Sequence, residues 1–297
     1  MVLPDLIEEF LQHLRIEKNC SPLTIRDYRH YLNKFNEYYK KNITELTIDD
    51  VRKFRVGLAD SGEMARVTQN YYVIALRSFL RYLIKKDIKT LAPEKIDLPK
   101  TESRSLKFLD RSQLERLLSS PNVSDEMGLR DKAVLETLFS TGLRVSELSK
   151  LNRDQLNFET REIGVIGKGG RARVVFISDS ASEWLQKYIV RRSDDFKPLF
   201  IRYSGKEDIE NNGEKMRLTP RSIERLVEKY VKKAKLPIKI SPHGIRHSFA
   251  TDLLYNGADI RSVQEMLGHK NIATTQIYTH VTNIQLKKVH QEFHSKG

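Results

Sequence analysis

The clearest β-strand signal in this 297-residue sequence is the stretch IGVIGKGGRARVVFI, residues 163–177. Residues 163–166 and 174–177 are rich in Val and Ile, and a glycine-rich loop separates them, which is typical of a β-hairpin. The segments on both sides have apolar residues at helical spacing instead. The sequence therefore predicts a mainly α fold with a small β-sheet, in which the hairpin belongs to an α+β domain.

The N-terminal third predicts an all-α domain of four helices. Apolar stripes at steps of three and four mark each helix, and Ser21 with Pro22 fits the cap and first position of the second. Thr47 fits the cap of the third helix, and the fourth runs from about residue 65 into Lys85 and Lys86. The stripe of the first helix consists of Ile7, Phe10, Leu11 and Leu14.

A change in composition predicts the domain boundary. Residues 92–107 contain Pro93, Pro99 and several charges but no apolar period, as linkers do. We therefore expect a helical domain at residues 1–95, a linker at 96–107 and a second domain at 108–297. Within the second domain, helices are expected near residues 110–118, 128–139 and 144–151, and the polar run 203–217 is expected to be a surface loop.

Charge points to a polyanionic partner. Lys and Arg number 52 against 39 Asp and Glu, a net charge of +13. Residues 1–105 carry 19 basic and 15 acidic side chains, and residues 106–297 carry 33 and 24, so both domains share the excess. Such a surface attracts nucleic acid, although proteins that never touch DNA also have a basic pI.

Other features of composition predict a soluble, cytoplasmic protein. The longest apolar run, residues 71–76, is far below the roughly 20 residues that span a bilayer. Acidic residues near the N-terminus disfavour a signal peptide. Cys20 is the only cysteine, so no intrachain disulfide and no cysteine-based zinc site is expected.

The segment SPHGIRH, residues 241–247, opens a predicted helix that Gly257 ends. His243 and Arg246 are three residues apart near the helix start, where free N–H groups and the helix dipole favour a phosphate. The same residues also fit a capping histidine and a solvated arginine.

His243 and His247, with His269 as a third ligand, have the spacing of zinc ligands. However, Gly244 stands where metalloproteases have a glutamate, and Arg246 would place a fixed positive charge beside the cation.

Two further residues carry reactive groups. Lys168 lies in the glycine-rich loop, which matches neither a Walker loop nor a dinucleotide-binding fingerprint, so it is either a solvated turn lysine or a mobile cation beside a groove. Tyr278 lies in TTQIYTH, residues 274–280. A tyrosine on a short helix usually only fills space in the core or on the surface. A phenol attacks phosphorus only where cations offset the developing charge and a base accepts its proton.

Five motifs in order resemble those of the tyrosine recombinase (phage integrase) family, particularly its Xer-type members. They are TGLRVSEL at 141–148, GKG at 167–169, HGIRH at 243–247, LGH at 267–269 and YTHV at 278–281. The resemblance covers essentially the whole chain and implies the catalytic residues Arg144, Lys168, His243, Arg246, His269 and Tyr278. It implies an N-terminal core-binding, SAM-like DNA-binding domain and a C-terminal catalytic domain that ends in a tail helix.

The resemblance also implies the reaction. Tyr278 would cleave DNA through a 3′-phosphotyrosine, with Arg144 and Arg246 on the phosphate oxygens, Lys168 as general acid and His243 taking the phenol proton; Glu147 would orient Arg144. Neither metal, ATP nor another cofactor is expected. The partners would be double-stranded recombination sites and three further protomers, as a homo-tetramer or a hetero-tetramer with a related recombinase, with nucleoid association when DNA is bound.

The biological role expected from the resemblance is resolution of chromosome and plasmid dimers, and thus chromosome partition at cell division. The same family includes mobile-element integrases and excisionases, which remain an alternative. A type IB topoisomerase shares the chemistry, and a DNA-binding protein that has lost catalysis would share the charge.

Overall fold

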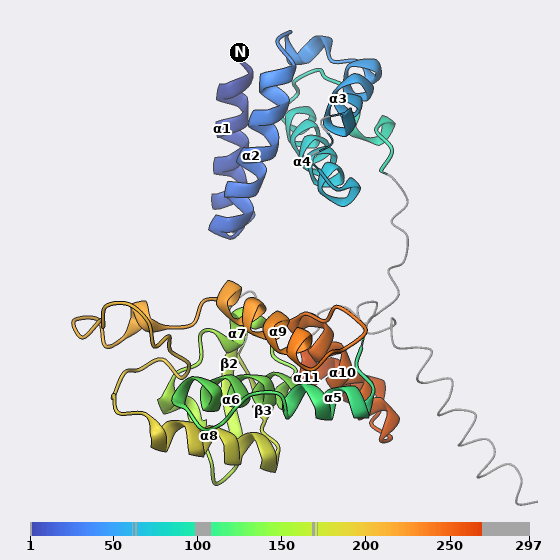
Figure 1. Cartoon of the computed structure of the whole chain (residues 1–297). Helices are drawn as coiled ribbons and strands as arrows, with labels where there is room; N and C mark the ends of the chain where they lie inside the picture. Colours follow the sequence, from blue (N-terminus) through green and yellow to red (C-terminus); the bar gives the residue numbers. More distant parts are fainter. Residues whose placement is uncertain are drawn as a thin grey trace, which may run out of the picture. The chain divides into compact units, whose positions relative to one another are not determined.

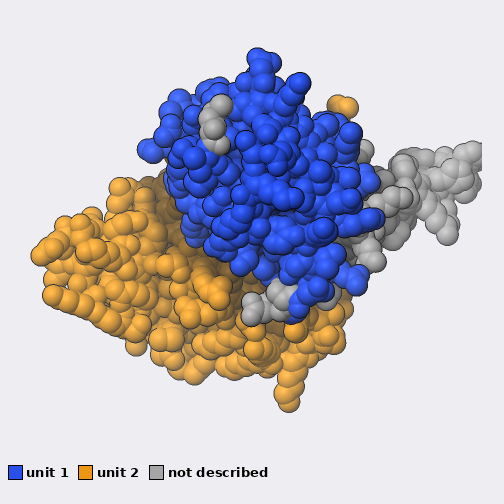
Figure 2. All heavy atoms as spheres, turned by 90° about the horizontal axis from the view of Figure 1, so that it is seen from above, with its two compact units in different colours: residues 1–103 blue, residues 104–297 orange. Residues whose placement is uncertain are grey.

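The computed structural model describes residues 2–60, 62, 64–98, 108–167, 170 and 172–268. The chain divides into two compact units, residues 1–103 and residues 104–297 (Figure 2). None of the helices among the described residues is long and apolar enough to cross a membrane.

The first unit contains the four expected helices: α1 (Leu3–Ile16), α2 (Pro22–Tyr38), α3 (Ile48–Asp60) and α4 (Arg66–Lys85) (Figure 1). Ser21 caps α2 by accepting a hydrogen bond from the Thr24 N–H, with Pro22 in the first turn. The apolar stripes meet in one core, where the Phe10 and Phe79 rings lie 5.5 Å apart. Ile96 is buried in this core as well.

Two arginines hold the chain where it leaves this unit. The 3₁₀ turn η2 (Pro93–Lys95) follows α4, and a further 3₁₀ turn, η1 (Ile43–Glu45), precedes α3. Arg55 of α3 donates to the Asp97 carbonyl at 3.1 Å, and Arg77 of α4 donates to the Ile96 carbonyl. Residues 96 and 97 are thereby attached to the helices of the first unit.

The second unit is helical around a small sheet, as expected. Its helices are α5 (Arg111–Leu118), α6 (Glu126–Thr141), α7 (Val145–Leu148), α8 (Asp179–Arg191), α9 (Pro220–Lys233), α10 (Pro242–Tyr255) and α11 (Ile260–Leu267), with 3₁₀ turns η3 (Arg153–Gln155) and η4 (Glu214–Met216). Helix α6 contacts α5, α8, α9 and α10, which explains why most of its residues are buried (Figure 1). The fold class predicted from the sequence is confirmed.

The sheet has one strand more than the sequence suggested. Strands β1 (Leu156–Asn157), β2 (Glu162–Ile166) and β3 (Ala172–Phe176) form an antiparallel sheet in that order. Gly164 pairs with Val174 and Val165 with Arg173, so β3 begins two residues earlier than expected. Ile163, Val165 and Val175 face the core, following the alternation of a sheet with one buried face.

Helices α8 and α9 were not identified from the sequence. Both carry standard N-caps: Ser178 accepts from the Ala181 N–H, and Thr219 accepts from the Ser222 N–H, with Pro220 in the first turn.

The polar run at residues 203–217, expected to be a surface loop, contains two buried residues, Asp208 and Met216.

Candidate functional site

Arg144 is positioned by a sharp turn between α6 and α7. Helix α6 ends at Gly142, which has a left-handed backbone (φ 58°). A Cβ at this position would lie 2.4 Å from the Phe249 ring of α10, so glycine is required by both conformation and space. Arg144 then caps α7, with its N–H donating to Glu147 Oε2 at 2.9 Å.

Glu147 is the centre of an ion-pair network. Its carboxylate accepts from Arg144 Nη1 at 2.9 Å and from both terminal nitrogens of Arg173, Nη1 at 3.1 Å and Nη2 at 2.8 Å. Burial alone would raise the pKa of Glu147, but the Arg173 hydrogen bonds, the Arg144 N–H and the two positive charges outweigh it and lower the pKa to about 2. The carboxylate is therefore ionised at all physiological pH values. The expected contact between Glu147 and Arg144 is present.

Arg246 connects the turn to the end of α11. Its side chain is buried, with Nη1 donating to the Gly142 carbonyl and Nη2 to the Leu267 carbonyl, each at 2.5 Å. Gly142 precedes Arg144 by two residues, so this bond attaches Arg246 to the turn that positions Arg144. Leu267 and Gly268 end α11, with Gly268 in a left-handed conformation (φ 64°).

His243 lies in the first turn of α10. Its Nε2 is 2.9 Å from His247 Nε2, and the rings meet edge to face with centroids 4.3 Å apart. His243 is exposed at the helix start, yet the surrounding protein partly desolvates its ring, which lowers its pKa; the charges of Arg246 and Arg144 lower it further. At neutral pH the imidazole is therefore uncharged and able to accept a proton.

The structure thus brings together three of the six predicted site residues, Arg144, His243 and Arg246. Lys168, His269 and Tyr278 lie outside the described residues. Ile166 pairs with Ala172, so Lys168 belongs to the connection between β2 and β3. His269 directly follows Gly268, at the end of α11.

Arg173 was not identified from the sequence. It lies on β3, where the alternation that buries Val175 also turns position 173 inward, and its side chain is only 15% exposed. A charged residue at an inward position of a short strand is the signal that could have identified it, because such a residue needs a buried partner.

The structure places two of the three residues of the zinc alternative, His243 and His247, side by side, whereas the third, His269, lies outside the described residues. The two Nε2 atoms are hydrogen-bonded to each other, and these are nitrogens that a shared metal would need. Among the residues the structure describes, no group of three His, Cys, Asp or Glu side chains could hold a metal ion.

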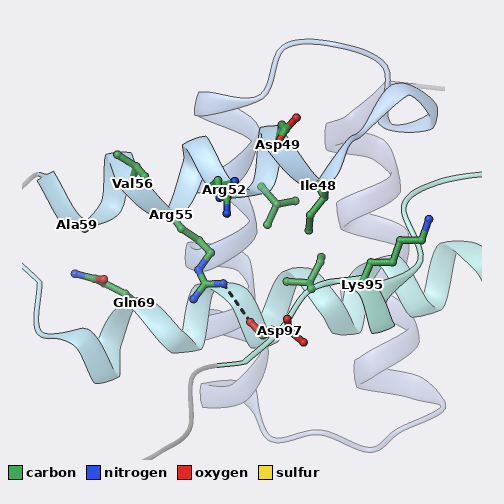
Figure 3. Close-up of a pocket in the computed structure, with 11 residues that line it drawn as sticks. Ile48, Asp49, Arg52, Arg55, Val56, Ala59, Gln69, Lys95 and Asp97 are labelled. Atoms are coloured by element: carbon green, nitrogen blue, oxygen red, sulfur yellow. Dashed lines mark hydrogen bonds between the residues drawn. The ribbon is translucent and has the colours of Figure 1, made fainter.

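The units also contain cavities. A groove of about 590 Å³ in the first unit lies between α3, α4 and the segment after η2, with Arg52, Arg55 and Lys95 in its lining (Figure 3). It contains none of the predicted site residues. In the second unit, a cavity of about 320 Å³ is lined largely by apolar side chains, including Phe139, Phe249 and Leu253.

Comparison with known proteins gives consistent matches along the chain. Residues 107–284 match the phage integrase family, and residues 7–87 match the N-terminal SAM-like domain of phage integrases. Tyrosine recombinase XerC of Pelotomaculum thermopropionicum is 39% identical over 304 residues, covering 98% of each protein. Tyrosine recombinase XerD of Listeria monocytogenes is 38% identical over 300 residues, covering 99% of each.

A solved structure gives the same result. The XerH site-specific recombinase bound to a palindromic difH substrate aligns with a TM-score of 0.72 and 25% identity, covering 95% of this chain and 82% of that one. The resemblance inferred from the five motifs is confirmed. The chain belongs to the phage integrase family, and within it the chain is a Xer-like tyrosine recombinase.

Proposed function

We propose that this chain is a site-specific DNA recombinase of the Xer type, which cleaves and rejoins strands through a 3′-phosphotyrosine on Tyr278. The observation that carries the proposal is the grouping of Arg144, Arg246 and a neutral His243: Arg246 donates to the carbonyl of Gly142, two residues before Arg144, and the charges of both arginines lower the pKa of His243. Full-length similarity to XerC and XerD and the net charge of +13 support the same function.

The two arginines bind the scissile phosphate. Among the described residues, Arg144 uses only Nη1 in a side-chain hydrogen bond, and its side chain is 36% exposed, so other N–H groups face solvent. Arginine offers five donors in a planar fork that matches two phosphate oxygens. Arg246 binds the same phosphate from α10, and His269 adds a hydrogen bond. Their charge stabilises the transition state, where negative charge on the oxygens grows.

Proton transfers accompany two exchanges of phosphorus–oxygen bonds. The Tyr278 Oη attacks phosphorus while His243 accepts the phenol proton, and the bond to the 5′ oxygen breaks as Lys168 protonates that oxygen. The 5′-hydroxyl of the partner strand later attacks the phosphotyrosine and releases Tyr278. One phosphodiester is exchanged for another, so the reaction needs no ATP.

The assembly we propose has four protomers on two paired DNA sites, either identical or shared with a related recombinase. Because the substrate is DNA of the host cell, the protein acts in the cytoplasm, on the nucleoid. Its role is resolution of chromosome or plasmid dimers.

Formation of the covalent adduct tests the proposal. Wild-type protein is incubated with a nicked duplex selected from random-sequence DNA for binding, and the products are separated on a denaturing gel. The Tyr278→Phe variant should bind this DNA as wild type does but form no adduct, because only the nucleophilic oxygen is removed. An adduct formed by the variant would reject Tyr278 as nucleophile.

A second assay separates recombination from related chemistry. Plasmids with one or two copies of the selected site are incubated with wild-type protein. Strand exchange that requires two sites supports the recombinase, whereas relaxation of a single-site supercoiled plasmid without exchange would indicate type IB topoisomerase chemistry.

A further inference from the structure

Arg173 connects segments that are far apart in the sequence. Its guanidinium donates hydrogen bonds to both carboxylate oxygens of Glu147, 26 residues away in the sequence, at 2.8 and 3.1 Å. The strand that carries it is held by pairing of Arg173 with Val165. The two-point contact therefore fixes the Glu147 carboxylate relative to the sheet, because a planar fork allows one orientation of its partner.

The orientation of Glu147 in turn determines that of Arg144. Glu147 Oε1 receives both Arg144 Nη1 and Arg173 Nη1, while Oε2 receives both the Arg144 N–H and Arg173 Nη2. A glutamate side chain without the second arginine would have several rotamers available. With Arg173 in place, Arg144 projects from a carboxylate that is held on both oxygens.

The same guanidinium lies against the residue before His269. A Cβ at Gly268 would lie 3.2 Å from Arg173 Cζ, Nε and Nη1, so the flat guanidinium occupies the space beside this glycine. Arg173 Nε is buried and has no hydrogen-bond partner among the described residues.

We propose that Arg173 is a positioning residue of the cleavage reaction, which sets the geometry of Arg144 through Glu147 and supports the Gly268 turn. This inference rests on the proposed function. Arg173 does not touch the DNA in this scheme; it holds the residues that do. A purely structural ion pair would stabilise the unit without setting the rate of the chemical step.

The test compares variants in single-turnover cleavage of the nicked, selected duplex at saturating protein. Arg173→Gln should reduce the cleavage rate constant about 10- to 100-fold, the usual cost of losing a supporting contact or shifting a reactive group by about 1 Å. The Kd for the duplex should stay within about twofold of wild type, since the variant leaves the DNA-facing groups in place. Arg173→Lys should recover only part of the rate, because an ammonium cannot grip both oxygens.

A double-mutant cycle identifies the route of the effect. Glu147→Gln should lose a similar fraction of the rate, and the double variant should be no slower than the slower single variant, because both changes remove the same support. Multiplicative losses would overturn the inference.

Arg217→Gln is the matched control. The Arg217 side chain is 14% exposed, and two of its nitrogens donate hydrogen bonds to the Glu214 carboxylate, at 2.7 and 2.6 Å. This control should lower the Tm of the second unit but keep the cleavage rate within about threefold of wild type. Equal rate losses in both arginine variants, or a wild-type rate in Arg173→Gln, would reject the positioning role. Absence of any adduct with wild-type protein would instead reject the proposed function.

Discussion

Substitution of Glu147 by Gln should destabilise the second unit in a way that depends on pH. Glu147 is 7% exposed, and its pKa is lowered from 4.5 to about 2. At 1.36 kcal/mol per pKa unit, the folded state favours the ionised carboxylate by about 3 kcal/mol. The substitution also leaves Arg173 with no opposite charge, and loss of one partner of a buried pair usually costs a similar amount. We therefore expect the free energy of unfolding to fall by about 3 kcal/mol at pH 7.

The sign of the pH dependence follows from the direction of the pKa shift. Because the folded-state pKa lies below the unfolded value, the stabilisation is complete well above pH 4.5 and is lost as the pH falls toward 2. The difference between wild type and Glu147→Gln should therefore shrink from about 3 kcal/mol at pH 7 to about 1 kcal/mol at pH 3.

Urea denaturation followed by tryptophan fluorescence measures this difference. The single tryptophan, Trp184, lies on α8, so the signal reports on the second unit. Glu228→Gln is the control, since Glu228 is an exposed carboxylate of the same unit that pairs with Lys232, and it should show no measurable change. A gap between wild type and Glu147→Gln that is the same at pH 3 as at pH 7 would refute the reasoning.

Three further predictions concern the reaction. Arg144→Lys and Arg246→Lys should each bind the selected duplex but cleave it at least about 10-fold more slowly than wild type. Only Arg246→Lys should also lower the Tm, because the Arg246 side chain joins two backbone carbonyls. Cleavage at the wild-type rate by either variant would contradict the role of that arginine. Lys168→Ala should cleave ordinary DNA slowly but recover when sulfur replaces the 5′ leaving oxygen, which departs without a proton; an equal defect on both substrates would leave Lys168 a positioning role only. Residues 283–295, which lie outside the described residues, carry Leu286, Val289 and Phe293 at helical steps. Truncation after Thr282 should abolish cooperative binding of a second protomer in gel shifts on full sites, while binding to half-sites persists. Unchanged cooperativity would exclude docking of this tail on a neighbouring protomer.

Features encoded in short stretches could be predicted from the sequence. The apolar stripes of α1 to α4, the Ser21 cap and the β2–β3 hairpin all depend on residues within a few positions of each other. Local spacing and capping determine such elements directly. The five motifs also identified the family, and with it Arg144, His243 and Arg246 as candidate site residues. Helices α8 and α9 begin at local caps of the same kind, Ser178 and Thr219.

The contacts that join the site could be established only from the tertiary structure. Arg246 bonds to the Gly142 carbonyl across 104 positions, and Arg173 meets Glu147 because the register of β2 and β3 turns it toward α7. Spacing along the chain carries no information about such pairs, since their approach depends on how the whole core of the second unit packs around α6. The lowered pKa of Glu147 has the same origin: only after the chain has folded do the hydrogen bonds and charges of Arg173 and Arg144 act on this carboxylate and outweigh the opposing effect of burial. The sequence alone thus determined which residue types were available, and packing decided which of them act on each other.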